Sequence, residues 1–206
     1  MSDRGGSHSR KTGPRGIKGP SHLLGVVVDA GFTLRLVPFG EVETGALYHL
    51  AHELQSIGAR ATIEGRVPLP KDARNERRDQ WLGRAFLELL GAFDGDRVLG
   101  VVGVDLYTPG LNFILGQAEV GGRAAVISTH RLAGGVDETT FEERLVKEAV
   151  HELGHTLDLE HCQDPRCVMH FSNTLGDTDH KGAAFCARCR PRAARTLLAI
   201  EKRGRG

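Results

Sequence analysis

The stretch HELGHTLDLEHC, residues 151–162, brings three histidines, one glutamate and one cysteine close together in the sequence. The run before it repeats apolar residues at the spacing of an amphipathic helix. Because Thr139 and Glu142 form a capping-box pattern, we predict a helix that starts near Asp137 and continues into the histidine stretch. The apolar stripe that should face the core comprises Phe141, Leu145, Val146, Ala149, Val150, Leu153 and Leu157.

His151 and His155 are four residues apart, so on a helix they are neighbours that can each offer one nitrogen to a shared metal ion. A rotation of 100° per residue places both imidazoles on the side away from the apolar stripe. Where two such imidazoles hold zinc, the adjacent carboxylate, here Glu152, acts as a general base toward a water whose pKa zinc lowers to about 7. We predict His151 and His155 as zinc ligands and Glu152 as the catalytic base.

His161 can be a third ligand only if the helix ends before it, because six more helical residues would carry it about 240° around the axis from His155. Asp158 stands where the chain must turn. Aspartate tolerates left-handed backbone angles better than most non-glycine residues, at a cost on the order of 1 kcal/mol. The sequence therefore predicts a turn at Asp158 and a zinc ligand at His161. The alternative is a group of helix-surface histidines without a metal.

Four cysteines fall in the last quarter of the chain, and the last two form a CxxC: Cys162, Cys167, Cys186 and Cys189. Two pairs of thiols separated by a modest loop fit a closed tetrahedral zinc site with sulfurs about 2.3 Å from the ion. Two disulfides are the alternative, and they would require an oxidising compartment. We predict a structural zinc ion, which would also help to fix the direction of His161 beside Cys162.

A chain of 206 residues is long enough for one well-buried core and short for two. We predict a disordered basic arm over residues 1–22, which contain almost no apolar side chains. Residues 23–206 should form a single domain that includes the structural zinc site (162–189) and a basic C-terminal helix or tail (191–206). The start has no run typical of a signal peptide, and the longest apolar run is too short for a membrane helix, so we expect a cytoplasmic protein.

Charge is distributed unevenly along the chain. Residues 1–20 carry 5 basic and 1 acidic residue and residues 181–206 carry 8 and 1, which leaves 14 basic and 24 acidic residues between them. Basic ends can contact nucleic acid through its phosphates, or they can be ordinary solvated ends. The aromatic content is only 5%, and no stacking module for RNA is recognisable. The composition therefore argues against nucleic acid as a partner.

Residues 32–129 alternate strand-like and helical patterns, which predicts an α/β fold with a layered sheet and covering helices. The apolar run 97–106 should be a central strand buried on both faces, and residues 111–118, bounded by glycines, a strand nearer an edge. Further strands are predicted at 32–39, 59–67 and 123–129, and helical patterns cover 41–58 and 73–93.

Together with Cys167-Val168-Met169 and FCARC at 185–189, the histidine stretch resembles the archaemetzincins, a family of metzincin-type zinc proteases. The family pattern reads HExxHxxGxxHCxxxxCxM with a later CxxC, and this chain matches every metal-ligand position. The resemblance covers about residues 34–190. Two positions depart from metzincin patterns: Asp158 replaces the turn glycine, and Phe171 lacks the hydroxyl of a tyrosine that ligates zinc in astacin-like relatives.

The resemblance implies a metzincin-like layered fold, with a twisted mixed β-sheet, flanking helices, and an antiparallel edge strand along the cleft. It implies two zinc ions, one catalytic on His151, His155 and His161 and one structural on the four cysteines. Met169 would form a soft floor under the site without chemistry of its own. A substrate peptide would add to the edge strand, for which 111–118 is the candidate.

We therefore predict a monomeric zinc metallopeptidase, a hydrolase that acts on a peptide or protein substrate with Glu152 as base. A zinc-stabilised nucleic-acid-binding or non-catalytic protein with a vestigial HExxH site is the alternative. A third possibility is a peptidase that holds its catalytic zinc weakly, because three neutral imidazoles bind zinc less securely than four thiolates. The sequence does not specify the substrate or the cleavage position.

Overall fold

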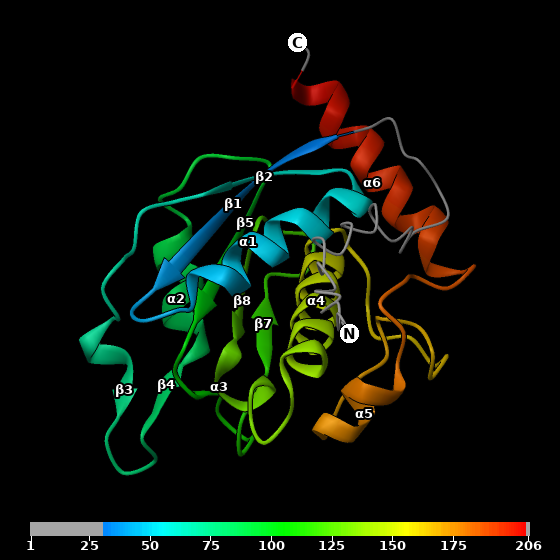
Figure 1. Cartoon of the computed structure of the whole chain (residues 1–206). Helices are drawn as coiled ribbons and strands as arrows, with labels where there is room; N and C mark the ends of the chain where they lie inside the picture. The colour runs from blue at the N-terminus through cyan, green and yellow to red at the C-terminus, as the bar shows by residue number, and fades with distance from the viewer. Residues whose placement is uncertain (1–30, 205–206) are drawn as a thin grey trace, which may run out of the picture.

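A computed structural model describes residues 31–204, and a mixed sheet forms its centre (Figure 1). Within these residues the main sheet has five strands in the order β2-β1-β5-β8-β7. The first four run parallel, and β7 pairs antiparallel with β8 at the edge. The strands are β1 (Phe32–Phe39), β2 (Ala59–Ile63), β5 (Arg97–Val102), β7 (Gly116–Ala118) and β8 (Ala124–Ser128). The predicted mixed sheet with an antiparallel edge strand is confirmed.

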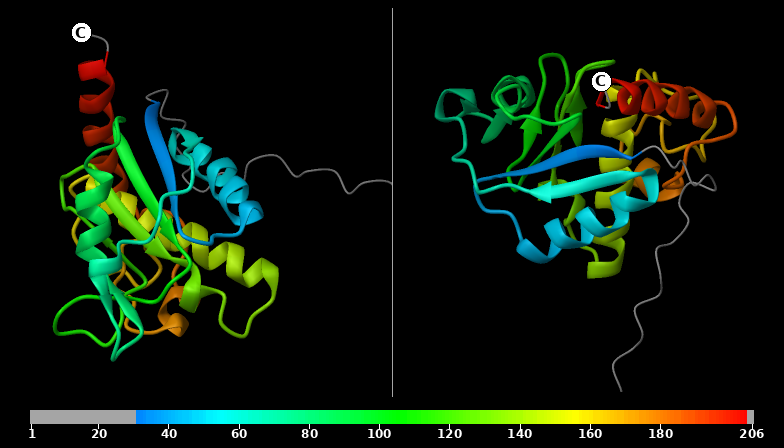
Figure 2. Two further views of the ribbon diagram at one scale, coloured as in Figure 1. Left: turned by 90° about the vertical axis from the view of Figure 1, so that its left-hand side faces the viewer. Right: turned by 90° about the horizontal axis from the view of Figure 1, so that it is seen from above.

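Helices cover both faces of this sheet (Figure 2). One core cluster packs α1 (Thr44–Glu53) and α4 (Glu138–Thr156) against one face, and a second cluster packs α2 (Gly83–Leu90) against the other. Strand β5 lies between them with every residue buried, as predicted for a continuous apolar run in a parallel sheet. The remaining helical elements are η1 (Leu54–Ile57), η2 (Lys71–Ala73), α3 (Thr129–Leu132), α5 (Leu175–His180) and α6 (Cys189–Gly204).

The helix predicted over residues 73–93 is wrong in its first half. There the chain forms β3 (Arg74–Asn75) and β4 (Gln80–Leu82), an antiparallel pair that β6 (Leu106–Tyr107) extends into a small second sheet. The four charged residues 76–79 supply no apolar face that a helix could bury, and Asp79 takes a left-handed conformation with φ 51° at the turn. Helix α2 begins only at Gly83.

The predicted edge strand is also shorter than residues 111–118. Only Gly116–Ala118 pair with β8. The carbonyls of Leu111 and Asn112 accept hydrogen bonds from the Arg78 guanidinium at 2.9 and 2.5 Å, so this part of the segment is tied to the β3–β4 hairpin. The predicted strand over 59–67 likewise ends at Ile63.

The long helix α4 begins where the sequence predicts, but with a different cap. The Asp137 carboxylate accepts a hydrogen bond from the Thr140 amide at 2.8 Å, so Asp137 is the N-cap residue. Thr139 lies inside the first turn, and the predicted capping box of Thr139 and Glu142 is therefore wrong.

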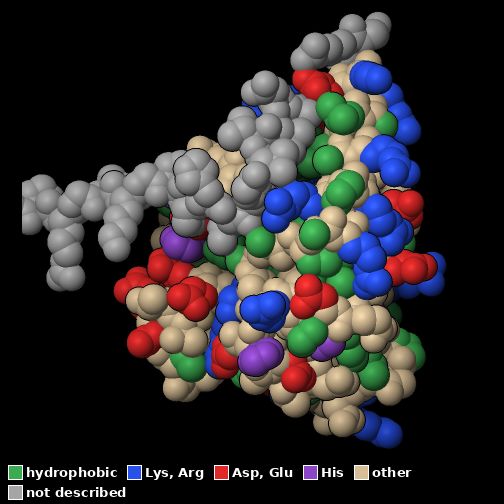
Figure 3. All heavy atoms as spheres, turned by 90° about the vertical axis from the view of Figure 1, so that its right-hand side faces the viewer, with side chains coloured by type: hydrophobic (Ala, Val, Ile, Leu, Met, Phe, Trp, Pro, Cys, Tyr) green, Lys and Arg blue, Asp and Glu red, His purple; other side chains and the backbone are tan. Residues whose placement is uncertain are grey.

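The predicted arm over residues 1–22 lies outside the described residues. The single domain over residues 23–206 stays a prediction. Its basic C-terminal segment falls largely on α6, where Figure 3 shows Lys and Arg side chains gathered. Among the described helices, none combines the length and the apolar character needed to cross a membrane.

Candidate metal centres

Helix α4 presents its histidines to a cleft and its apolar stripe to the core. His151 and Glu152 are each 5% exposed, and His155 is half-buried. Together with His161 they line a cleft of about 430 Å³. The stripe residues belong to the main core cluster or pack against it. The predicted separation of imidazoles from the apolar stripe is confirmed.

The turn after α4 forms at the predicted residue. Asp158 has φ 63°, in the left-handed region that glycine occupies most easily. The Leu159 amide donates to Gly154 O at 3.1 Å, which closes the helix and reverses the chain. His161 therefore returns to the same side as His151 and His155.

The three imidazoles converge on one point. A nitrogen from each ring lies within 4.8 Å of one from each of the others. Nδ1 of His151 lies 2.7 Å from Val168 O, and Nδ1 of His155 lies 2.7 Å from Leu159 O. Because a carbonyl can only accept, both Nδ1 atoms carry the proton, and the two Nε2 atoms face each other 3.2 Å apart as lone-pair donors.

This arrangement fits a metal ion. Two facing lone pairs repel each other unless a cation lies between them. In a tetrahedral zinc site with bonds of about 2.0–2.1 Å, two ligating nitrogens lie about 3.3 Å apart. Burial lowers the pKa of His151 well below its ordinary value and also lowers the pKa of His155 and His161, so all three rings favour the neutral form that binds metal.

Glu152 belongs to a group of charged residues that line the cleft. Its carboxylate is buried against the backbone of β7 at Gly116. Burial and the nearby Glu148 raise the pKa of Glu152 well above its ordinary value, and Lys181 acts in the opposite direction. Lys181 Nζ lies 2.9 Å from Glu148 Oε1, and both side chains are almost fully buried. No sequence pattern indicated this ion pair or the contact at Gly116, because the partners lie on separate elements.

Met169 lies beneath the histidine helix. A Cβ atom at Gly154 would overlap Met169 Sδ, so the glycine in HELGH allows the methionine to approach α4 closely. Phe171 packs its ring 4.8 Å from the ring of His161 and supplies no polar atom to the site.

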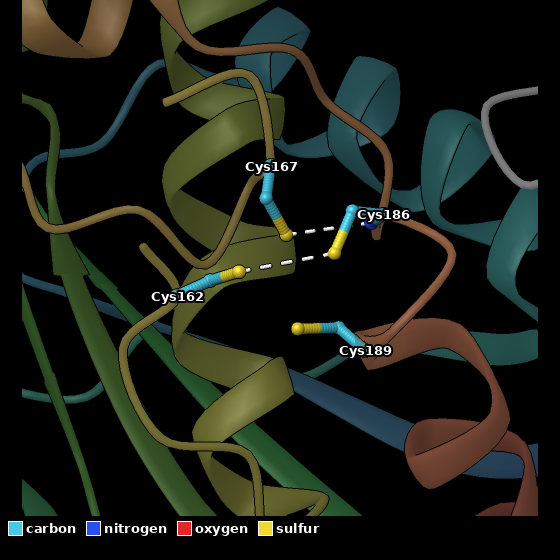
Figure 4. Close-up of side chains that lie close together, drawn as sticks. All are labelled: Cys162, Cys167, Cys186 and Cys189. Carbon is cyan, nitrogen blue, oxygen red and sulfur yellow. Dashed lines mark hydrogen bonds between the residues drawn. The ribbon is translucent and has the colours of Figure 1, made fainter. Parts of the chain in front are cut away.

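The four cysteines also converge, as Figure 4 shows. All are free thiols, and their sulfurs lie within 4.8 Å of one another. Cys162 Sγ lies 3.8 Å from Cys186 Sγ, whereas a disulfide requires about 2.05 Å. In a tetrahedron with zinc–sulfur bonds of about 2.3 Å the sulfurs are about 3.8 Å apart. The geometry fits a closed zinc site and argues against the alternative of two disulfides.

Electrostatics within this group favour a bound cation. Burial raises the pKa of Cys167, and burial together with Cys167 raises that of Cys189. Burial opposes ionisation of Cys162 as well, but hydrogen bonds from the Asp164 backbone and Arg188 lower its pKa to about 7. Four thiolates in so small a volume require a positive ion to ionise together.

Strand β7 forms one wall of the cleft with an open edge. Ser128 N donates to Leu115 O, and Glu119 N donates to Ala124 O. In an antiparallel pair the hydrogen-bonding direction alternates, so Gly116 and Ala118 direct their backbone groups toward the cleft. Apolar side chains line the same cleft: Leu111, Phe113, Ile114, Val120 and Phe171.

A comparison with protein families matches residues 70–195 to peptidase family M54. This chain belongs to that family. The protein named archaemetzincin in Methanopyrus kandleri is 45% identical over 148 residues, which cover 71% of this chain and 84% of the relative. That of Pyrococcus abyssi is 43% identical over 169 residues, which cover 75% and 90%.

Solved structures of archaemetzincins share the fold. The crystal structure of archaemetzincin from Methanopyrus kandleri superimposes with a TM-score of 0.76 at 39% identity, over 84% of this chain and 99% of that one. The structure from Archaeoglobus fulgidus, complexed with malonate, gives 0.73 at 37% identity, over 78% and 99%. The archaemetzincin resemblance and the metzincin-like fold are confirmed. The chain is a zinc metallopeptidase, and the alternative of a nucleic-acid-binding protein with a vestigial site is not favoured.

Proposed function

We propose that this peptidase uses two zinc ions with separate roles. His151, His155 and His161 hold the catalytic ion, and the four cysteines hold the structural one. The observation that carries the proposal is the pair of opposed Nε2 atoms of His151 and His155, 3.2 Å apart beside the buried carboxylate of Glu152. When bound, zinc supplies Lewis acidity that polarises a carbonyl and lowers the pKa of a water molecule to about 7.

Glu152 acts as the proton carrier. Its carboxylate accepts a proton from the attacking water and then donates it to the amine that leaves when the peptide bond breaks. A raised pKa suits this role, because transfer in both directions is efficient when the pKa of the carrier lies near the working pH. Lys181 limits this rise by its positive charge, since Glu148 alone would raise the pKa of Glu152 further.

The substrate binds as an extended strand along β7. The backbone groups of Gly116 and Ala118 that face the cleft pair with the main chain of the peptide. Main-chain pairing aligns the extended peptide with the edge strand and places a scissile carbonyl beside α4. We further propose that the protein acts as a monomer in the cytoplasm, where the four thiols stay reduced.

Exchange of Glu152 for alanine tests the catalytic role. The Glu152→Ala protein should keep two zinc ions and lose hydrolysis of a peptide library by at least about a hundredfold, because proton transfer by a placed side chain contributes about 10²–10⁴-fold. Mass spectrometry of the digest and metal analysis of the same samples provide the two measurements. Unchanged hydrolysis by Glu152→Ala would refute the role of Glu152. Wild-type protein that binds only one zinc ion even when zinc is supplied in excess would refute the two-ion proposal.

A further inference from the structure

The C-terminal end of α4 leaves carbonyl groups that need partners outside the helix. Backbone amides serve two of these carbonyls. Leu159 N donates to Gly154 O at 3.1 Å, and Gly121 N, from the turn between β7 and β8, donates to His155 O at 2.9 Å. The next three carbonyls, of residues 156–158, are bound by side chains from distant parts of the chain.

Arg97, the first residue of β5, holds the first of these carbonyls. Its Nη2 donates to Thr156 O at 2.9 Å, and its Nε donates to Thr156 Oγ1 at 2.9 Å. Arg97 is only 6% exposed, and it forms no ion pair with a carboxylate in residues 31–204. A buried cation is costly, and here the carbonyls of Thr156 and Asp96, the negative charge of the nearby Asp96 and the negative end of the helix dipole stabilise it.

Helix α6 holds the other two carbonyls. Thr196 Oγ1 donates to Leu157 O at 3.1 Å, and Arg192 Nη2 donates to Asp158 O at 3.3 Å. The same helix begins at Cys189, one of the four clustered thiols. Helix α6 therefore joins the cysteine group to the turn from which His161 returns to the cleft.

We propose that Arg97, Thr196 and Arg192 are positioning residues, which we term the carbonyl clamp, and that they hold His161 at the catalytic zinc by fixing the turn after α4. The inference rests on the proposed function in one respect, that the three histidines bind zinc. A turn made by a non-glycine residue at φ 63° is unfavourable by about 1 kcal/mol on its own. The clamp offsets this cost and gives the turn a single conformation.

Zinc affinity measured separately at the two sites tests the clamp. Arg97→Met and Thr196→Val remove donors from β5 and from α6, and Arg123→Met is the matched control, since Arg123 is an exposed arginine that donates to Gly95 O at 2.9 Å. Competition with a graded series of chelators gives the dissociation constant of each zinc in the full chain. Loss of a partner that is hydrogen-bonded to a ligand weakens metal binding by about ten- to a hundredfold. Because Arg97 and Thr196 act on His161 through the turn, we expect the lower end of this range, about tenfold, at the histidine site of both variants.

The zinc affinity of the cysteine site should equal that of the wild type in both variants. In the Arg123→Met control, the zinc affinities of both sites should equal those of the wild type. Cobalt substitution adds a second readout, because the visible spectrum of Co²⁺ at the histidine site reports the loss of a ligand directly. Affinities at this site within about twofold of the wild type in both variants would overturn the proposal. If Arg97→Met fails to fold, the zinc affinity of the Thr196→Val variant is judged by the same criterion, since Thr196 is only half-buried. A wild-type protein that binds no zinc at its histidines would instead refute the proposed function.

Discussion

At the scale of single residues, glycine is required at position 116 because the carboxylate of Glu152 lies against it. A Cβ atom there would come within 2.6 Å of Glu152 Cγ and Oε1. We predict that Gly116→Ala displaces the carboxylate and lowers kcat by up to about a hundredfold, since a shift of about 1 Å in a catalytic group can cost that much. Steady-state kinetics on a cleaved peptide, with metal analysis to show that zinc is retained, provide the check.

Gly65→Ala serves as the control for this substitution. An added Cβ at Gly65 would meet no atom within 4 Å, so its kinetics should match those of the wild type. A Gly116→Ala protein with wild-type kcat would show that the backbone of β7 does not position Glu152.

The sequence predicted the site residues whose relation is local and failed for those whose relation is not. His151 and His155 are four residues apart on a helix, and a left-handed turn at Asp158 follows from where His161 must go. The contact of Gly116 with Glu152 and the pairing of Arg97 with Thr156 join separate elements, so they depend on the packing of the sheet against α4. No spacing in the sequence encodes that packing.

At the scale of elements, the same distinction explains which strands and helices were predicted. Strand β5 and helix α4 have unambiguous apolar patterns, and both begin where expected, although β5 ends at Val102 and not at residue 106. Residues 73–82 and 111–115 instead depend on polar contacts with each other. Gln80 Nε2 donates to Asn112 O at 3.0 Å and to Asp105 Oδ2 at 2.8 Å, which joins the hairpin to the cleft wall. Hydrophobic periodicity contains no information about such a network.

Helix α5 is attached to α4 by an ion pair whose contribution depends on pH. Arg144 donates to both oxygens of Asp179 at 2.6 and 2.7 Å and lowers the pKa of that carboxyl. A lowered folded-state pKa adds stability above the unfolded value of about 3.9, and this stability is lost as the pH falls through the folded-state pKa. We predict that Asp179→Asn is less stable than the wild type at pH 7 by about 1 kcal/mol or less, because Asp179 is partly exposed.

Urea unfolding of both proteins at several pH values measures this contribution. The difference between Asp179→Asn and the wild type should shrink as the pH falls below about 4 and should vanish only below the lowered folded-state pKa, where both side chains are neutral. A difference that stays constant from neutral to acid pH would assign the effect of the substitution to something other than the charge on Asp179.

At the scale of the whole molecule, loss of the metal ion should have a different effect at each of the two candidate sites. The cysteine group joins the loop after α4 to the start of α6, and three of its four thiols are buried. An ion bound there would contribute to folding, whereas an ion at the histidine site, which lines the cleft, would contribute mainly to activity. We predict that a mild chelator removes one zinc and abolishes hydrolysis, with the circular dichroism spectrum unchanged and activity restored by added zinc.

Loss of the second ion should instead destabilise the fold. Cys186→Ser, at the most accessible of the four thiols, should lower the melting temperature by several degrees or more, since each 1 kcal/mol corresponds to about 2–4 °C in a domain of this size. His161→Ala should leave the melting temperature closer to that of the metal-saturated wild type. Calorimetry of the two variants and the wild type measures these losses of stability. If the two variants lose equal stability, the roles are not separate, and α6 transmits the loss of either ion to the whole core.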